Sequence, residues 1–264
     1  MITYKTYAEI EIMKQGGAIL AAILKKTAEL VRPGASAADL EQFATEKIAD
    51  AGAKPAFLNY KTKNANPYPN ILSVSVNSEV VHALPLIDKI FQQGDVVGLD
   101  CGIWYNGLSV DAALTVACGE VDAQSRKLIN TTREALQIGV SKCRIDNYLG
   151  DMGFAVQKFV ESQGFKVIKT LVGHGVGYQV HEDPQVPNFF PFDEKNPKNR
   201  GPKLKQGMTL AIEPMVSISA EKTKKGKDGF ASITIDGSLS AHFEHTVAVT
   251  KNGPLILTLD LGYY

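Results

Sequence analysis

The chain has 264 residues, which is enough for one large domain or two small ones. Its 28 basic and 28 acidic residues give a formal net charge of zero, so the composition gives no support to a protein that binds nucleic acid or an anionic membrane. The three cysteines form no CxxC pair, which argues against a disulfide framework and favours a reducing compartment. The N-terminus is too polar for a signal peptide and the apolar run at 18–24 is too short for a membrane span, so we expect a soluble cytoplasmic protein with no membrane contact.

The first half of the chain reads as helices followed by strands. Thr6 and Glu9 form a capping-box pattern, and apolar residues then recur at helical spacing. Asn106-Gly107 between two apolar runs is a strong hairpin signal. In chain order the pattern predicts helices over 6–31 and 36–52, a loop over 53–70, a strand over 71–76 and a hairpin over 94–119.

Two acids interrupt the apolar strands of that hairpin. If the turn is Asn106-Gly107, Asp100 lies opposite Ala113, the same-face neighbour of Asp111; if the turn is Tyr105-Asn106, the two acids face each other directly. Both registers put the carboxylates on one face of the sheet. Such a face is either exposed to solvent or balanced by something positive, and the hairpin alone does not decide between the two.

The second half repeats this order. Its pattern predicts helices over 122–140 and 147–162, two apolar strands with a glycine turn over 166–180, a loop over 188–206, a strand over 208–218, a solvated turn over 221–229, and strands over 230–235 and 243–250. We therefore expect an internal duplication, with halves of about 6–120 and 121–260 in one domain that spans 1–264.

The positions of four acids support the duplication. Asp100 follows a glycine by six residues at the end of an apolar strand, and so does Glu213. Asp111 and Glu244 each open a later strand that a glycine closes. Two equivalent halves would bring two acids each into one shared site.

Four carboxylates that converge within apolar strands need cations to balance them. The candidate ligands are Asp100, Asp111, His174, Glu213 and Glu244. Oxygen-rich ligands with one imidazole suit Mn, Fe(II), Co or Zn in an open site rather than a closed structural zinc site, and they do not fix the identity of the metal. Taken singly, each acid is more often a surface carboxylate and a lone histidine more often a packing or surface residue.

Other catalytic motifs are absent from the sequence. It contains no HExxH, no GxSxG and no Walker motif, so a nucleophile-based hydrolase has no support. GHGVG at 173–177 lacks the spacing and the strand-helix context of a dinucleotide fingerprint.

Taken together, the sequence motifs of this chain and their order resemble a known family over nearly the whole chain, namely the type I methionine aminopeptidases of the "pita-bread" metallopeptidases. The motifs that carry the resemblance are NSEVVHALP, GLDCGIWYNGLSVDAALT, GHGVGYQVHEDPQVP, TLAIEPMV and SLSAHFEHTVAVT. Each motif is weak alone, but together they are highly specific. Only 31 residues separate His181 from Glu213, whereas type II members carry a large insertion there.

The resemblance implies an α+β fold, a curved antiparallel sheet in two pseudo-symmetric halves with helices on the outer face. It places the ligands of two divalent metal ions on the five residues named above. It also implies that Glu213 acts as ligand and proton shuttle, that His82 contacts the substrate near the scissile nitrogen, and that His181 hydrogen-bonds the tetrahedral intermediate. The substrate would be the N-terminal methionine of nascent peptides whose second residue is small.

The chain departs from the family pattern mainly around the substrate pocket. Ser73 stands where the family usually has cysteine, and Phe230 where a tryptophan is common. Tyr60, Tyr68 and Phe230 are candidates for the methionine pocket, although ordinary core packing explains them nearly as well. These departures bear on side-chain selectivity and not on metal chemistry.

Two rivals and two further expectations remain. A proline-specific aminopeptidase of the same fold would share the five ligands but usually carries an additional N-terminal domain, and a metal-free binding protein on this fold would have lost ligands. The Lys-rich runs 195–205 and 222–227 are most simply solvated loops, with transient contact to the ribosome as the weaker interpretation. We expect a monomer.

Overall fold

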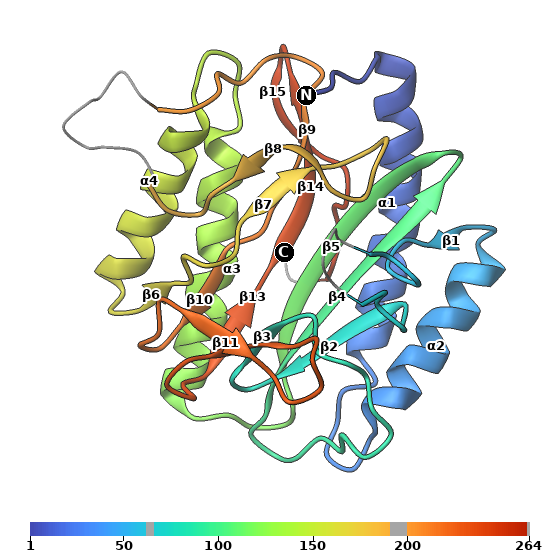
Figure 1. The fold of residues 1–264 in the computed structure, drawn as a ribbon, viewed down its shortest axis with the longest axis vertical. Coiled ribbons are helices and arrows are strands. Elements are labelled where there is room, and N and C mark those ends of the chain that lie inside the picture. The colour runs from blue at the N-terminus through green and yellow to red at the C-terminus, as the bar shows by residue number, and fades with distance from the viewer. Residues whose placement is uncertain (62–65, 191–199, 263–264) are drawn as a thin grey trace.

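The computed structural model describes residues 1–61, 66–190 and 200–262 (Figure 1). Its helices are α1 (Tyr7–Ala28), α2 (Ala37–Asp50), α3 (Ala123–Lys142) and α4 (Leu149–Ser162). The side chains of Thr6, Ser36 and Asp122 accept hydrogen bonds from the first turns of α1, α2 and α3. These bonds satisfy backbone N–H groups that have no partner inside a helix, and for this reason the helices begin where the sequence predicts.

Antiparallel strands form one large sheet and two small ones. The large sheet runs in the order β1 (Lys54–Pro55), β4 (Val96–Tyr105), β5 (Leu108–Ala117), β14 (Glu244–Thr250), β9 (Thr209–Ile212), β7 (Gly173–Gly175) and β8 (Glu182–Val186), with β2 (Leu72–Val76) also paired to β4 and β15 (Gly253–Ile256) to β14. The small sheets are β13 (Ser240–His242), β10 (Met215–Ser217) and β6 (Lys166–Val167), and β11 (Thr223–Lys225), β12 (Ser232–Thr234) and β3 (Glu79–Val81).

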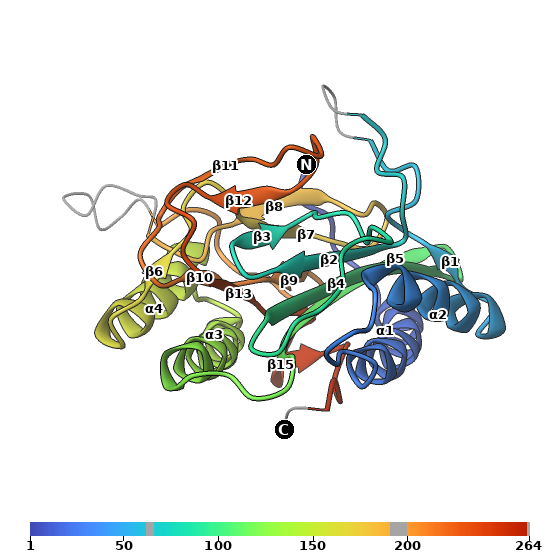
Figure 2. The same ribbon diagram turned by 90° about the horizontal axis from the view of Figure 1, so that it is seen from below.

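The four helices lie on one side of the molecule, with α1 against β4 and β5 of the large sheet and α4 against β6 of a small sheet, and the sheet of β3, β11 and β12 lies on the opposite side (Figure 2). On β4 and β5, Leu99 and Leu114 are cross-strand partners that belong to the main hydrophobic core together with Leu20 and Leu24 of α1. Because successive side chains of a strand point to opposite faces, the neighbour Asp100 points away from the helices. The alternation therefore keeps the core on one face and leaves the other for a site.

The predicted fold class is confirmed, including the curved antiparallel sheet with helices on its outer face. The hairpin turns at Asn106-Gly107, because Asp100 pairs with Ala113. Asn106 and Gly107 both have positive φ, as a tight two-residue hairpin turn requires. No described helix has the length and apolar character that crossing a membrane would need.

The second half is more broken than its apolar pattern predicts. The stretch 166–180 forms only the short strands β6 and β7. Glycine is required at 173 and 175 in β7, because a Cβ atom at either position would fall 2.3 Å from a backbone carbonyl oxygen. His181 lies in a bend before β8 and not in a strand. The predicted strand over 208–218 is two strands, β9 and β10, in different sheets, since Pro214 cannot donate a ladder hydrogen bond.

Two polar segments also differ from their predictions. The turn over 221–229 contains the edge strand β11, which pairs with β12. The lysines of β11 made the segment read as a solvated turn, although charged side chains are common on edge strands. The loop predicted over 188–206 and the Lys-rich run over 195–205 lie partly outside the described residues.

Candidate metal centre

Three of the predicted acids lie on the face of the sheet that points away from the helices. Ala113 of β5 pairs with Asp100 on one side and with Glu244 on the other. Asp111, two residues before Ala113, shares this face. The small alanine side chain leaves space between the carboxylates that flank it.

Glu213 and His174 complete the cluster from the second half of the molecule. His174 pairs with Ala211 of β9, and Glu213 follows the last residue of that strand. The backbone carbonyl of Glu213 accepts a hydrogen bond of 2.9 Å from the buried side chain of Asn188, and this bond fixes the chain at the break before Pro214. The His174 Nε2 atom lies 3.5 Å from Glu213 Oε1.

The tautomer of His174 follows from its other ring nitrogen. Nδ1 lies 2.8 Å from the carbonyl oxygen of Gly175. A carbonyl oxygen only accepts hydrogen bonds, so Nδ1 carries the proton and the lone pair of Nε2 points toward the acids. Metal-binding histidines are typically oriented in this way.

The carboxylates lack the partners that buried charges need. Within the described residues, one oxygen each of Asp100, Asp111 and Glu244 is buried without a hydrogen bond. Ligand atoms of Asp111, His174 and Glu244 lie within 4.8 Å of one another, as do those of Glu213, His242 and Glu244. Buried unpartnered acid oxygens with a neutral imidazole are the donor set that divalent cations take, so the residues fit such ions.

Without cations, burial and mutual repulsion oppose the charged forms. Burial raises the pKa of Asp111 to about 7. Burial, reinforced by the neighbouring acids, holds the pKa values of Asp100, Glu213 and Glu244 well above their ordinary range. Burial also lowers the pKa of His174 to about 4, which keeps this imidazole neutral at pH 7. The cluster is therefore costly by itself and is balanced only by added positive charge.

Two more histidines border the acids. His82 directly follows β3 with a positive φ of 62°, a conformation that is rare for residues other than glycine and that occurs preferentially at functional sites. The ring of His181 lies 4.1 Å from that of His174 and 4.9 Å from that of Tyr60, measured between centroids. Desolvation lowers the pKa of both His82 and His181, although both residues line the pocket and are exposed.

A pocket of about 220 Å³ opens over the acids, between the large sheet and the sheet of β3, β11 and β12. Its aromatic wall contains the predicted Tyr60, Tyr68 and Phe230, and also Phe57, which the sequence patterns did not single out. Tyr68 makes edge-to-face contacts with Phe57 and Phe230 at centroid distances of 6.5 and 5.8 Å. The Tyr68 hydroxyl donates to the carbonyl oxygens of Leu72 and Ala83, so the ring and not the hydroxyl faces the pocket.

His242 is a second residue, besides Phe57, that the sequence patterns did not single out. Its Nε2 atom is buried without a hydrogen bond and lies 3.6 Å from Glu213 Oε2 and 4.0 Å from Glu244 Oε2. The signal in the sequence was its place two residues before Glu244, since residues two apart in a strand share a face, but the strand predicted over 243–250 begins after His242.

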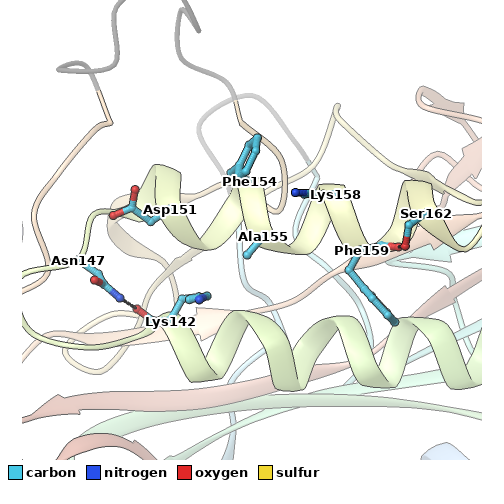
Figure 3. A pocket seen from close by; sticks show the side chains of 8 residues that line it. All are labelled: Lys142, Asn147, Asp151, Phe154, Ala155, Lys158, Phe159 and Ser162. Atoms are coloured by element: carbon cyan, nitrogen blue, oxygen red, sulfur yellow. Dashed lines mark hydrogen bonds between the residues drawn. The ribbon is translucent and has the colours of Figure 1, made fainter.

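Another hollow lies on the outside of the molecule between α3 and α4, where Phe154 is 49% exposed (Figure 3). The side chains that line it are mixed, and Asn147 donates a hydrogen bond to the carbonyl of Lys142 across one end. Among the described residues that line it, Asp151 is the single acid, and Arg200 pairs with that acid. This hollow offers no group of metal ligands and does not compete with the cluster on the sheet.

Comparisons with known proteins agree with this geometry. Residues 11–251 match the model of metallopeptidase family M24. A methionine aminopeptidase of Aquifex aeolicus is 45% identical over 251 residues, which cover 95% of this chain and 96% of the relative. The crystal structure of methionine aminopeptidase from Thermotoga maritima is 43% identical, with a TM-score of 0.92 over 98% of this chain and 99% of that one.

A more distant structure separates fold from function. The Xaa-Pro dipeptidase from Bacillus anthracis is 22% identical with a TM-score of 0.74, and the match covers 97% of this chain but 62% of that one. This likeness shows the shared fold alone. The resemblance to type I methionine aminopeptidases is confirmed by the closer relatives, and the chain belongs to metallopeptidase family M24.

Proposed function

We propose that this chain is a metal-dependent methionyl aminopeptidase that removes the N-terminal methionine from peptides whose second residue is small. The observation that carries the proposal is the set of buried, unpartnered acid oxygens at the floor of an aromatic-walled pocket. Relatives named methionine aminopeptidase that are 38–45% identical over nearly the full chain support it. The long coverage of these relatives also favours it over a proline-specific enzyme.

The ligands of two divalent ions would be Asp100, Asp111, His174, Glu213 and Glu244. When bound, such ions polarise the scissile carbonyl and lower the pKa of an attacking water. Co, Mn, Fe(II) and Zn all suit this donor set, and metal availability decides among them.

The protein's own groups would handle the protons and the developing charge. The two carboxylate oxygens of Glu213 face His174 and His242, which orient it as the group that accepts a proton from water and returns it to the leaving amine. His181 would donate a hydrogen bond to the oxyanion of the tetrahedral intermediate, and His82 would contact the scissile nitrogen. Both histidines are neutral at pH 7, because desolvation lowers their pKa values, and a neutral imidazole can donate such bonds.

The aromatic wall would receive the methionine side chain. Tyr60, Tyr68 and Phe230 supply apolar ring faces, and a long, polarisable thioether packs well against aromatic rings. We further place the protein in the cytoplasm as a monomer that acts on nascent chains. Transient ribosome contact through the lysines of 222–227 is part of this proposal.

The test is hydrolysis of Met-Ala-X, Leu-Gly-X and Ala-Pro-X peptides with and without a chelator. We expect Met-Ala-X to be cut at least about tenfold faster than Leu-Gly-X, Ala-Pro-X to stay uncut, and the chelator to abolish activity. Efficient cleavage of Ala-Pro-X alone would assign the chain to the proline-specific relatives. If the chain cut none of the peptides and bound no metal, it would be a binding protein. Asp111→Ala is the control variant, and it should lose both the bound metal and the activity.

A further inference from the structure

A buried ion pair lies directly behind the turn that carries His181. Lys5 Nζ lies 2.7 Å from Glu182 Oε2, and the two side chains are 1% and 4% exposed. Lys5 belongs to the segment before α1, and Glu182 is the neighbour of His181, so the pair joins parts of the chain that are 177 residues apart. Surface ion pairs contribute little to stability, but a pair this far from solvent is a fixed structural link.

The two oxygens of Glu182 hold different partners. Oε2 accepts from Lys5 and from the hydroxyl of Thr3, whereas Oε1 accepts from the backbone N–H of Gln179 at 2.9 Å. The carboxylate therefore closes the backbone turn 179–182 and at the same time fastens this turn to the N-terminal segment.

The N-terminal segment is itself anchored on both sides of this link. The backbone N–H of Lys5 donates to the carbonyl of Gly207 at 2.7 Å. The Tyr178 hydroxyl donates to Glu9 in the first turn of α1, and Lys5 Nζ lies 4.7 Å from the centre of the Tyr178 ring. Gly177 lies beside it with a φ of 142°, which favours glycine, and a Cβ atom there would fall 2.3 Å from Lys5 Cε. The N-terminal segment and the first turn of α1 thus hold the His181 turn through Tyr178 before the histidine and Glu182 after it.

His181 needs such support because its ring has little of its own. Among the described residues it makes ring contacts with Tyr60 and His174 but no hydrogen bond. Its placement then depends on the backbone that carries it, and misplacement of a group that acts on a transition state by about 1 Å can cost up to about a hundredfold in rate.

We infer that Lys5 and Glu182 are positioning residues that fix His181 over the metal centre. This inference rests on the proposed function, in which His181 acts on the tetrahedral intermediate. Removing one partner alone would leave an uncompensated buried charge and would destabilise the fold. The informative variant is therefore Lys5→Met/Glu182→Met, which removes both charges and keeps side chains of similar length.

The kinetic test is a cycle with His181→Ala on the metal-loaded enzyme and Met-Ala-X. We expect Lys5→Met/Glu182→Met to lower kcat about tenfold or more with KM and bound metal unchanged. The same double change in the His181→Ala background should cost nothing further, because the pair acts through that ring. Lys5→Arg should retain most of the activity. An unchanged kcat in the double variant, or an equal loss in both backgrounds, would overturn the inference.

A second readout does not depend on turnover. The chain has five histidines, so ring signals of the 13C-histidine-labelled protein are few, and the signal missing in His181→Ala belongs to His181. This signal should shift or broaden in Lys5→Met/Glu182→Met and stay in place in Arg200→Met, which breaks the half-buried Arg200–Asp151 pair instead. If the parent enzyme fails to cut Met-Ala-X, the proposed function fails while this signal still tests the link. An unmoved signal would refute the link itself.

Discussion

Ala113 is the small residue that lies between two of the acids. It pairs with Asp100 on one strand and with Glu244 on the next, and it shares their face of the sheet. Ala112 points to the opposite face, where it belongs to the hydrophobic core. A larger residue at 113 would occupy the space between the carboxylates, whereas one at 112 would only crowd the core.

We therefore predict that Ala113→Val lowers bound metal and activity by at least about tenfold, because the added methyl groups occupy the space in which the acids would bind ions. Ala112→Val should lower the melting temperature through overpacking, at a cost of about 1–3 kcal/mol, and keep its metal. Metal analysis after gel filtration measures both variants. Full metal content in Ala113→Val would contradict the placement of the ions among these acids.

His242 gives a second prediction at this scale. Its buried Nε2 atom faces Glu213 and Glu244, so it can donate a hydrogen bond that orients these carboxylates. Loss of such a supporting partner typically costs about 10–100-fold in metal affinity. Titration calorimetry should show this loss in His242→Leu and near-parent affinity in His242→Gln, whose amide keeps a donor. Equal affinity in all three proteins would remove His242 from the site.

Single residues also mark how far the sequence could predict this site. Asp100 and Asp111 follow from the hairpin, since a period of two and an Asn-Gly turn fix their common face. His242, which lies beside the acids, and Phe57, which lines the pocket, do not follow, because the path of each segment depends on tertiary contacts. Sequence patterns predict faces of regular elements and not the approach of distant loops.

At the scale of elements, the breaks in the strands position the chemistry. The chain leaves the large sheet after β9 at Glu213-Pro214 and joins a small sheet as β10. β14 begins at Glu244, and one residue separates it from the end of β13 at His242. The apolar residues of 208–218 predicted one strand where there are two, because an apolar run indicates that a segment is buried but not where the chain changes direction. Both glutamates lie at such breaks.

Where β5 and β14 diverge, a side chain replaces the ladder. The Thr246 hydroxyl donates to the carbonyl of Asp111 at 2.7 Å and accepts from its N–H at 2.9 Å. Thr115 makes the equivalent pair of bonds with the backbone of His242. These hydroxyls let the sheet open around the acids without leaving backbone groups unpaired.

Thr246→Val should therefore destabilise the protein by about 1–3 kcal/mol, because it leaves a buried N–H and carbonyl of Asp111 unsatisfied. Urea unfolding followed by circular dichroism measures this change. Thr45→Val, which removes a hydroxyl on the exposed face of α2, is the control and should stay within about 0.5 kcal/mol of the parent. A cost as small as that of the control would show that water or a local shift replaces the two bonds.

At the scale of the whole molecule, two of the acids, Asp100 and Asp111, follow α1 and α2 in the chain, and the other two, Glu213 and Glu244, follow α3 and α4. We propose that residues 1–264 form one catalytic domain with pseudo-equivalent halves of about 6–120 and 121–260. The order of elements supports this, since α1 and α2 precede β4 and β5 as α3 and α4 precede β9 and β14. Gathering four acids from both halves makes the centre expensive to fold without metal, and this cost depends on pH.

The final prediction concerns that cost in the metal-free protein. Burial raises the pKa of Asp111 from 3.8 to about 7, so between these values the folded state binds a proton that the unfolded state has lost. Stability then falls as pH rises through this window. Metal-free Asp111→Asn carries no such charge. Its stability advantage over metal-free wild type should grow by on the order of 3 kcal/mol between pH 5 and pH 8.

Added metal should reverse the trend in the wild-type protein, because ions bind the ionised carboxylates of the folded state only. The rise in melting temperature that metal produces should therefore be larger at pH 8 than at pH 5 in wild type, and small at both values in Asp111→Asn. If the stability difference between the two metal-free proteins stayed the same from pH 5 to pH 8, Asp111 would not be buried as a costly charge. The balance between buried acids and bound cations would then have to rest on the other three carboxylates.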